Sequence, residues 1–230
     1  MTEQKNQNIK KTDSASKKVD NFLTNHLKIF IIFLIIIVCG ILSYILGSHF
    51  GLKAKTKDLS ALDEISYELT NESAALETSE LDARRATAFE KLEVYTKKSG
   101  IVGARANMLC AELSYSQEKY EDSAKYWEIV AKKSKKSYLE PIADYNLGVC
   151  YEKLGKIDDT IAAYKKASEN EEFSLRSHAS FSYGRILESN GKYKEAIEVY
   201  SELNSRNPDD DWAKLAKTRI LTLQVEGKSE

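Results

Sequence analysis

Apolar residues are distributed unevenly along the chain, in two patterns that require different surroundings. Between Ile29 and Leu46 the chain is almost entirely apolar and carries no charge. At about 1.5 Å per residue, a helix that begins here and continues to Phe50 is long enough for the roughly 30 Å hydrocarbon core of a bilayer. A buried helix of a soluble protein is rarely apolar on every face. The pattern therefore predicts one membrane-spanning helix over residues 28–50.

A cleaved signal peptide and a lipoprotein signal are the alternatives for this segment. A signal peptide needs a short charged start and an apolar core of about 7 to 15 residues, and both parts are longer here. In a lipoprotein, Cys39 would be the modified residue, but Val38 precedes it where a small residue is expected, and the apolar run continues beyond it. Lipidation of Cys39 is left open, and a spanning helix is favoured.

Lysines on the two sides of the apolar segment indicate its orientation. Six lysines precede it, among them Lys10, Lys11, Lys17, Lys18 and Lys28, and three follow it before Asp58, namely Lys53, Lys55 and Lys57. Because positive charge is retained in the cytoplasm, this bias favours a cytoplasmic N-terminus. Residues 1–27 hold too few large apolar side chains to bury a core, so we expect a disordered cytoplasmic tail. Its lysines can meet anionic lipid headgroups.

The region after the span repeats itself. Three similar segments begin at Asn107, Asp144 and Ser180. The matching lysines Lys119, Lys156 and Lys192 lie 37 and 36 residues apart, and a period in this range is typical of stacked helical hairpins. The units lie near residues 103–136, 141–171 and 177–208.

The repeating residues resemble the tetratricopeptide repeat family. In the second unit, Leu147, Gly148 and Tyr151 match the first-helix pattern, Gly155 the turn, and Tyr164 and Ala167 the second helix. Gly184, Gly191, Ala196, Tyr200 and Pro208 hold the corresponding places in the third unit. The first unit is degenerate, with Ala111, Ser123 and Trp127 in the glycine, small and aromatic positions. The resemblance implies paired helices that stack into an array.

Helical periodicity extends to both sides of the three units. Residues 59–98 carry apolar stripes that predict an irregular first hairpin. Residues 209–224 combine an acidic start with an apolar stripe, which predicts a C-terminal capping helix. The expected fold class is all-α: a single N-terminal transmembrane helix, then a tetratricopeptide-type array of helical hairpins over residues 53–230.

Charge and motif content argue against catalysis and nucleic-acid binding. After Leu52 there are 28 Lys and Arg against 32 Asp and Glu, so we expect no basic face for nucleic acid. The three histidines lie far apart, and we find no nucleotide-binding or nucleophile motif. We expect no metal, no cofactor and no enzyme activity. Cys110 and Cys150 stand in adjacent first helices, and whether they pair is left open.

The surface expected to bind is the concave face that first helices form in this family. In the glycine register that face presents Arg105, Met108, Glu112, Tyr145, Asn146, Val149, Glu152, His178, Phe181 and Arg185. Some members hold a C-terminal carboxylate with a clamp of Lys, Asn and Arg, and only Asn146 matches that clamp. The groove's ligand, whether an extended peptide or a helix, is left open.

The arrangement of the whole chain is similar to the ancillary Sec-translocon subunits of bacterial inner membranes. That resemblance rests on a lysine-rich tail, one span and a repeat domain that begins with an alanine-rich helix near Gly103. It implies a periplasm-facing scaffold whose partners are the translocon, chaperones or folding factors. An envelope-assembly or cell-division scaffold and a cytoplasm-facing recruitment scaffold remain as alternatives, since they share the same fold.

Overall fold

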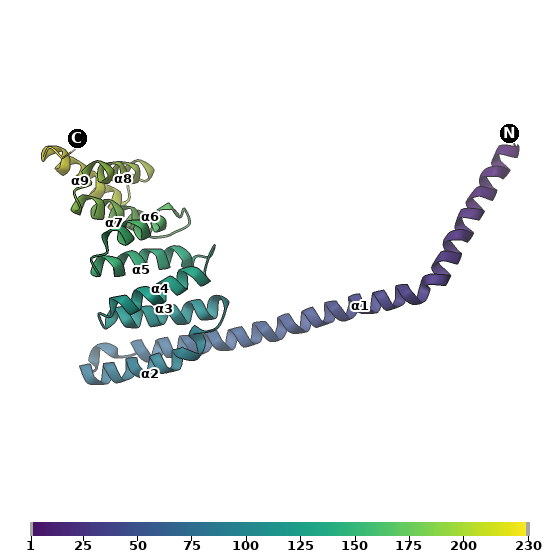
Figure 1. The fold of residues 1–230 in the computed structure, drawn as a ribbon, viewed down its shortest axis with the longest axis horizontal. Coiled ribbons are helices and arrows are strands. Elements are labelled where there is room, and N and C mark those ends of the chain that lie inside the picture. Colours follow the sequence, from purple (N-terminus) through teal and green to yellow (C-terminus); the bar gives the residue numbers. More distant parts are fainter. Residues whose placement is uncertain (1, 229–230) are drawn as a thin grey trace. The chain divides into compact units, whose positions relative to one another are not determined.

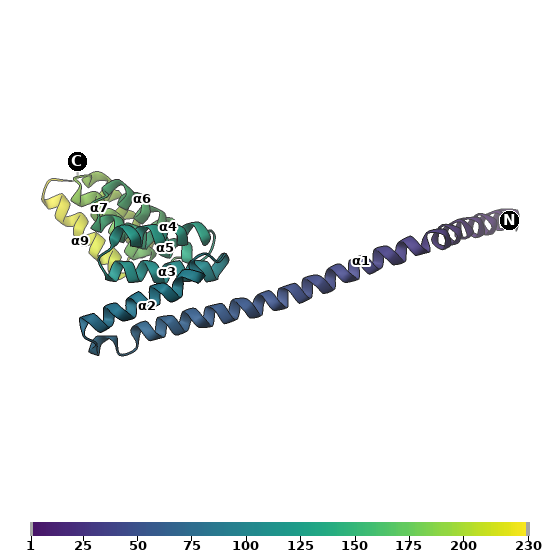
Figure 2. The same cartoon turned by 60° about the horizontal axis from the view of Figure 1, so that its bottom comes forward.

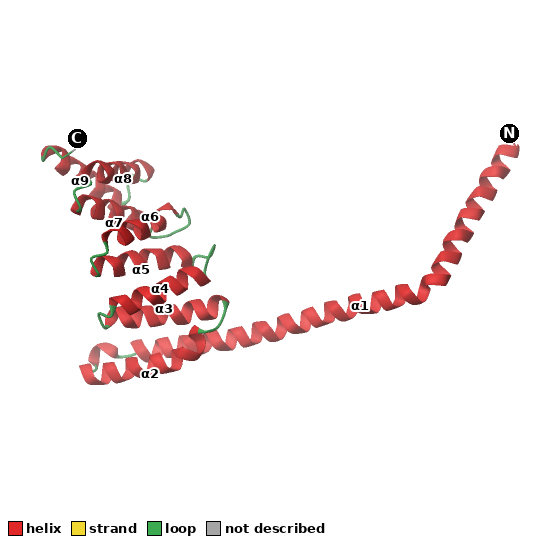
Figure 3. Cartoon of the chain, in the orientation of Figure 1, coloured by secondary structure: helices red, strands yellow, loops and turns green. Residues whose placement is uncertain are grey.

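The chain is helical throughout the part that the structure describes. The computed structural model describes residues 2–228, with residues 2–21, 23, 25 and 28 described by their backbone alone, and it has no strand in that range. In order the helices are α1 (Thr2–Thr70), the 3-10 turn η1 (Ser73–Ala75), α2 (Thr78–Thr96), α3 (Gly100–Ser116), α4 (Tyr120–Lys133), α5 (Leu139–Lys153), α6 (Ile157–Glu169), α7 (Arg176–Ser189), α8 (Tyr193–Arg206) and α9 (Asp211–Val225). Figure 3 shows these helices joined by short loops. The all-α prediction is confirmed.

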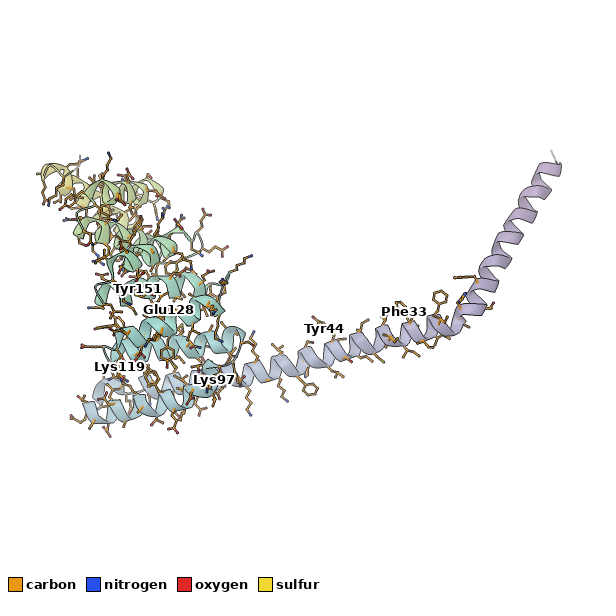
Figure 4. The ribbon with its side chains drawn as sticks, viewed as in Figure 1. Phe33, Tyr44, Lys97, Lys119, Glu128 and Tyr151 are labelled. Carbon is orange, nitrogen blue, oxygen red and sulfur yellow. The ribbon has the colours of Figure 1, made fainter. Side chains whose placement is uncertain are left out.

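The chain divides into two compact units, residues 1–57 and 58–230. Helix α1 contains the apolar segment and is the one helix among the described residues that is long and apolar enough to cross a membrane. Its side chains project freely: Phe33 is 62% exposed, and Figure 4 shows Phe33 and Tyr44 pointing away from the helix. A helix that is apolar all round and covered by no protein suits a lipid environment.

Residues 2–27 have helical backbone as part of α1, whereas the sequence predicts a disordered tail over residues 1–27. The difference has a physical basis, because adding residues to an existing helix avoids the cost of a new helix nucleus. The side chains of residues 1–21, and all of residue 1, lie outside the described residues. Disorder of the tail therefore stays a prediction.

The second unit begins with a hairpin between the end of α1 and α2, which Figures 1 and 2 show side by side. Leu62 and Ile65 of α1 are buried with Ala88 and Leu92 of α2. The same cluster includes Val102 of α3. The last turns of α1 thus close one end of the helical array.

Three helical hairpins follow with the same register. Ala106 of α3, Ala143 of α5 and Ala179 of α7 are each fully buried and lie 37 and 36 residues apart. Ala213 of α9 is also fully buried, 34 residues after Ala179. Helix α9 therefore occupies the place of a fourth first helix.

Within the second and third hairpins, a glycine lets the two helices approach until a tyrosine ring covers its backbone. A Cβ at Gly148 would lie 2.6 Å from the ring of Tyr164, and one at Gly184 would lie 2.5 Å from the ring of Tyr200. The first hairpin has no such glycine, because Ala111 stands in its place. Its second helix carries Ser123, whose hydroxyl donates to the carbonyl of Ala111 at 2.8 Å.

The turn inside each hairpin needs one residue in the left-handed conformation. Gly155 and Gly191 have φ of 68° and 76°, and Glu118 has φ of 59° at the matching place in the first hairpin. Glycine adopts this conformation freely, while other residues incur about 1 to 2 kcal/mol. The first hairpin therefore carries local strain that the other two avoid.

Helix α9 differs from the earlier first helices at the positions where those helices meet their second helices. Thirty-four residues after Tyr183 and Gly184, where α7 meets α8, stand Lys217 and Thr218, which are both exposed. Leu221 and Val225 of α9 are also exposed, so this face of the last helix mixes polar and apolar side chains.

Cys110 and Cys150 are free, buried thiols. They lie in different core clusters, and the thiol of Cys150 lies 3.3 Å from the hydroxyl of Ser123. Burial raises the pKa of Cys110 to about 12. The disulfide that the sequence left open is therefore not formed.

Replacing Gly148 with alanine should destabilise the array, because the new methyl group would overlap the Tyr164 ring. Inserting one carbon into a packed contact typically costs about 1 to 3 kcal/mol. Denaturant unfolding of the full-length chain in micelles, followed by circular dichroism, measures the loss. An Ala163→Gly control, which removes a methyl group from the facing helix, should leave the ring in place, and an unchanged midpoint for Gly148→Ala would contradict the close approach.

Candidate functional site

The predicted binding residues lie on the first helices of the hairpins. We define the first-helix face as the surface formed by α3, α5, α7 and α9. Helix α3 contributes Arg105, Met108 and Glu112; α5 contributes Tyr145, Asn146, Val149 and Glu152; and α7 contributes His178, Phe181 and Arg185. All are partly buried except Glu112, which is exposed.

A row of aromatic rings crosses the face from α5 to α9. The Tyr145 hydroxyl lies 3.1 Å from Nδ1 of His178, and the two ring centroids are 5.2 Å apart. His178 in turn stacks on Trp212, with centroids 3.9 Å apart and ring planes at 11°. Phe181 closes the row, 5.3 Å from Trp212. We call Tyr145, His178, Phe181 and Trp212 the aromatic row.

Trp212 is the member of this row that the sequence analysis assigned to the cap and not to the binding face. The signal that could have placed it is spacing: Trp212 follows His178 by 34 residues, as Ala213 follows Ala179. Extending the first-helix register into the cap would have identified the tryptophan. It is also the largest aromatic side chain on the face, and tryptophan is enriched where binding energy concentrates.

His178 is uncharged at neutral pH. Burial lowers its pKa, and the positive charge of Arg185 lowers it further. A neutral imidazole can exchange one hydrogen bond with the Tyr145 hydroxyl while stacking on the indole. The row therefore offers apolar and aromatic surface without net charge.

Next to the row, where the Tyr145 and Tyr164 rings are in contact, a tyrosine, a glutamate and an arginine connect three successive helices. The Tyr164 hydroxyl of α6 donates to Oε2 of Glu152 on α5 at 3.0 Å. Arg185 of α7 donates to both carboxylate oxygens of Glu152, at 2.9 and 2.7 Å. Burial opposes ionisation of Glu152, but the hydrogen bonds from Arg185 and Tyr164 outweigh it and lower its pKa. Glu152 is thus held as a carboxylate.

The same connection recurs one repeat later. The Tyr200 hydroxyl donates to Oε2 of Glu188 at 3.0 Å, and Arg219 of α9 donates its Nε to the same oxygen at 3.1 Å. A second guanidinium nitrogen pairs with the other carboxylate oxygen. Two-point pairing of this kind fixes geometry as well as charge. Helices α7 and α9 are therefore each held by the repeat before them.

Other predicted site residues are engaged inside the protein. Arg105 pairs with Asp63 of α1 at 2.7 Å. The side-chain amide of Asn146 donates to the carbonyl of Ile142 at 2.8 Å, which occupies a donor that a carboxylate clamp would use. Met108 packs against the core cluster of the first two hairpins. The polar groups of Arg105 and Asn146 are therefore already bonded within the protein, and Met108 contributes packing.

Glu112 differs from the other polar residues on the face. No hydrogen bond or ion pair to its carboxylate is present among the described residues. Burial by neighbouring atoms raises its pKa, although the side chain stays open to solvent. Glu112 is therefore a carboxylate that lines a concavity without a protein partner.

Clusters suited to metal binding are absent from the described residues. Within that part of the chain, no group of three or more His, Cys, Asp and Glu side chains is placed to hold an ion. The arrangement combines aromatic surface, internally paired charges and one open carboxylate, which suits recognition of another polypeptide.

Comparison with known sequences gives matches over the repeat region. A family model described as tetratricopeptide repeat matches residues 111–170 and 153–211. A TPR repeat-containing protein of Treponema pallidum (strain Nichols) is 25% identical over 130 residues, which is 56% of this chain and 54% of the relative. The chain thus spans about half the length of this curated relative.

Solved structures give the same fold. The nearly identical TPR-like repeats of a kinesin light chain from Podosopora anserina match with a TM-score of 0.53, covering 74% of this chain and 86% of that one. A substituted form of those repeats matches equally, with the same TM-score of 0.53. Sequence identity is 12% in each case, so the likeness concerns the fold alone.

Removing the guanidinium of Arg185 should destabilise the protein in a pH-dependent way. The pKa of Glu152 is lowered in the folded state, so the pair contributes stability above the unfolded carboxyl pKa, about 4.3, and loses it as the pH falls through the folded value. Arg185→Met should therefore cost about 1 kcal/mol at neutral pH, and clearly less near pH 3.

Denaturant titrations of the full-length chain at the two pH values measure this difference. Lys165→Met, which removes an exposed positive charge from α6, is the control. Equal destabilisation by Arg185→Met at both pH values would show that only packing of the side chain contributes.

Proposed function

We propose, from the premise that residues 111–211 of this chain are tetratricopeptide repeats, that the protein is a membrane-anchored scaffold whose first-helix face binds a partner polypeptide. Repeats of this kind indicate protein–protein interaction. The membrane anchor and the identity of the binding face are the parts that the proposal adds.

The aromatic row is the observation that supports the binding face. Its rings come from three different helices, α5, α7 and α9, and are partly exposed. Aromatic side chains provide large contact area with little loss of conformational entropy, and they are enriched at binding hot spots. The paired charges below the row hold the helices in place, so a partner would meet a preformed surface and incur less ordering cost.

The apolar part of α1 supports the anchor. Large apolar residues from Ile29 to Leu46 are about half exposed or more, an arrangement that is costly in water but favourable in lipid. Tethering would raise the effective concentration of the array near membrane partners, so a modest intrinsic affinity would suffice. If alkaline carbonate released the chain from the membrane fraction, the anchor would be disproved.

Association with the Sec translocon or with export chaperones belongs to the same proposal, with the array on the periplasmic side of a bacterial inner membrane. The lysine bias across the span and the arrangement of the whole chain support this orientation. Protease treatment of cells with an opened outer envelope tests it: digestion of the array agrees with the proposal, and protection places the array in the cytoplasm.

Site-specific photocrosslinking in cells tests the binding face. A photoreactive amino acid at Val149 lies on α5 within the first-helix face, whereas the same group at Val199 lies on α8, outside that face. Both valines are partly buried, so they form a matched pair. We expect crosslinked partner bands at Val149 and few or none at Val199.

The full-length chain is used for both variants, and membrane localisation is checked for each. Equal crosslinking at the two positions, or crosslinking at Val199 alone, would contradict the assignment of the first-helix face.

A further inference from the structure

A pocket of about 260 Å³ opens between the end of α1, α2 and α3. Four leucines form its apolar lining: Leu69, Leu81, Leu109 and Leu113. Glu112 and Arg85 are the charged residues that line it, and serine and threonine side chains complete its wall. The volume equals that of roughly eight or nine waters at about 30 Å³ each, which is ample for one long side chain.

The two charged residues in the pocket are not equivalent. Arg85 pairs with Asp82 of its own helix at 3.0 Å, and its side chain is only 20% exposed. Glu112 has no such partner among the described residues. Arg85 and Asp82 together are neutral, so the pocket carries the net negative charge of Glu112.

The register of the repeats explains why Glu112 is unpaired. Counting from the glycine position, Glu112 corresponds to Val149 in the second unit and to Arg185 in the third. Arg185 is taken up by Glu152 of the preceding unit. In the first unit this position holds the carboxylate of Glu112 instead of an arginine. No arginine or lysine of the α1–α2 hairpin lies within ion-pair distance of that carboxylate.

We propose that this pocket receives a lysine or arginine side chain of the polypeptide that is held on the first-helix face. The leucines would cover the methylene groups of such a side chain, and the Glu112 carboxylate would pair with its cationic end. The inference rests on the proposed function, because it assigns a residue type to the partner of that same face. It adds a fixed anchor point at α3, away from the aromatic row of α5, α7 and α9.

Atoms packed near the Glu112 carboxyl group favour its pairing with a cation. Neighbouring atoms raise the pKa of this carboxyl group, which means that its negative charge is incompletely solvated and has no cation of the described chain to balance it. An incoming cation would supply that balance, and attraction between charges increases as water is displaced. An anionic or neutral polar side chain would not gain this attraction to the Glu112 carboxylate.

Fluorescence anisotropy with labelled peptides tests the proposal on the full-length protein in non-ionic micelles. The probe is the peptide Gly-Ser-Lys-Gly-Ser-Lys-Gly-Ser, compared with versions in which norleucine or arginine replaces each lysine. We expect the lysine and arginine peptides to bind more tightly than the norleucine peptide. Affinity should fall about tenfold in Glu112→Gln, a change that converts to about 1.4 kcal/mol, and should also fall as salt is raised.

Two variants control this measurement. Glu171→Gln removes one negative charge at an exposed turn and should leave the affinity unchanged. Ser116→Lys places an ammonium group four residues after Glu112 on α3, where an i, i+4 pair forms readily. This internal lysine should occupy the carboxylate and prevent peptide binding, while circular dichroism shows that the helices are retained.

Equal affinities for Glu112→Gln and Glu171→Gln would overturn the pocket assignment, as would equal binding of the norleucine and lysine peptides. These failures differ from failure of the proposed function. If crosslinking at Val149 persists while Glu112 has no effect, the scaffold stands without the basic anchor. If Glu112-dependent binding occurs but partners crosslink only at Val199, the pocket stands and the first-helix face is not the partner surface.

Discussion

The close contact between a glycine on one helix and a tyrosine ring on the next determines most of this array. At Gly148 and Gly184 the ring lies where a side chain would otherwise be. The contact sets the distance between paired helices, and it also places each tyrosine hydroxyl beside a glutamate of the first helix. That glutamate then binds an arginine of the following unit. One local contact thus fixes the packing inside a hairpin and the position of the next.

This coupling gives the first-helix face its properties. Charged residues of the face are paired with one another in holding α5, α7 and α9 together, so Tyr145, His178, Phe181 and Trp212 lie beside charges that already have partners. The first unit lacks the coupling, because Tyr115 stands where Glu152 and Glu188 stand in the other units. Its polar residues do not take part in that pairing, and Glu112 has no hydrogen-bond or ion-pair partner among the described residues.

Most of the fold can be read from the sequence because it depends on local patterns. The glycine and tyrosine register predicts the hairpins, and the uncharged run predicts the long apolar helix. The register also gave the first-helix residues, but it did not give their pairing: Glu152 and Arg185 are 33 residues apart, and two charges at that separation pair only once the helices are stacked. Trp212 was missed because the cap was treated as an end and not as a further first helix. The pocket beside Glu112 depends on the irregular hairpin of α1 and α2, for which no repeat pattern exists.

Hydrogen exchange of the full-length chain tests the central claim, that α7 and α9 are each held by a glutamate of the repeat before them. Glu188→Gln weakens the link between α7 and α9 without altering either helix's apolar contacts. We predict that amides of α9 (Asp211–Val225) exchange about tenfold faster or more in this variant, since a lost charged pair of 1.4 kcal/mol corresponds to that factor, while α3 and α4 stay unchanged. Unchanged exchange in α9 would show that apolar packing alone positions the helix and would contradict the account.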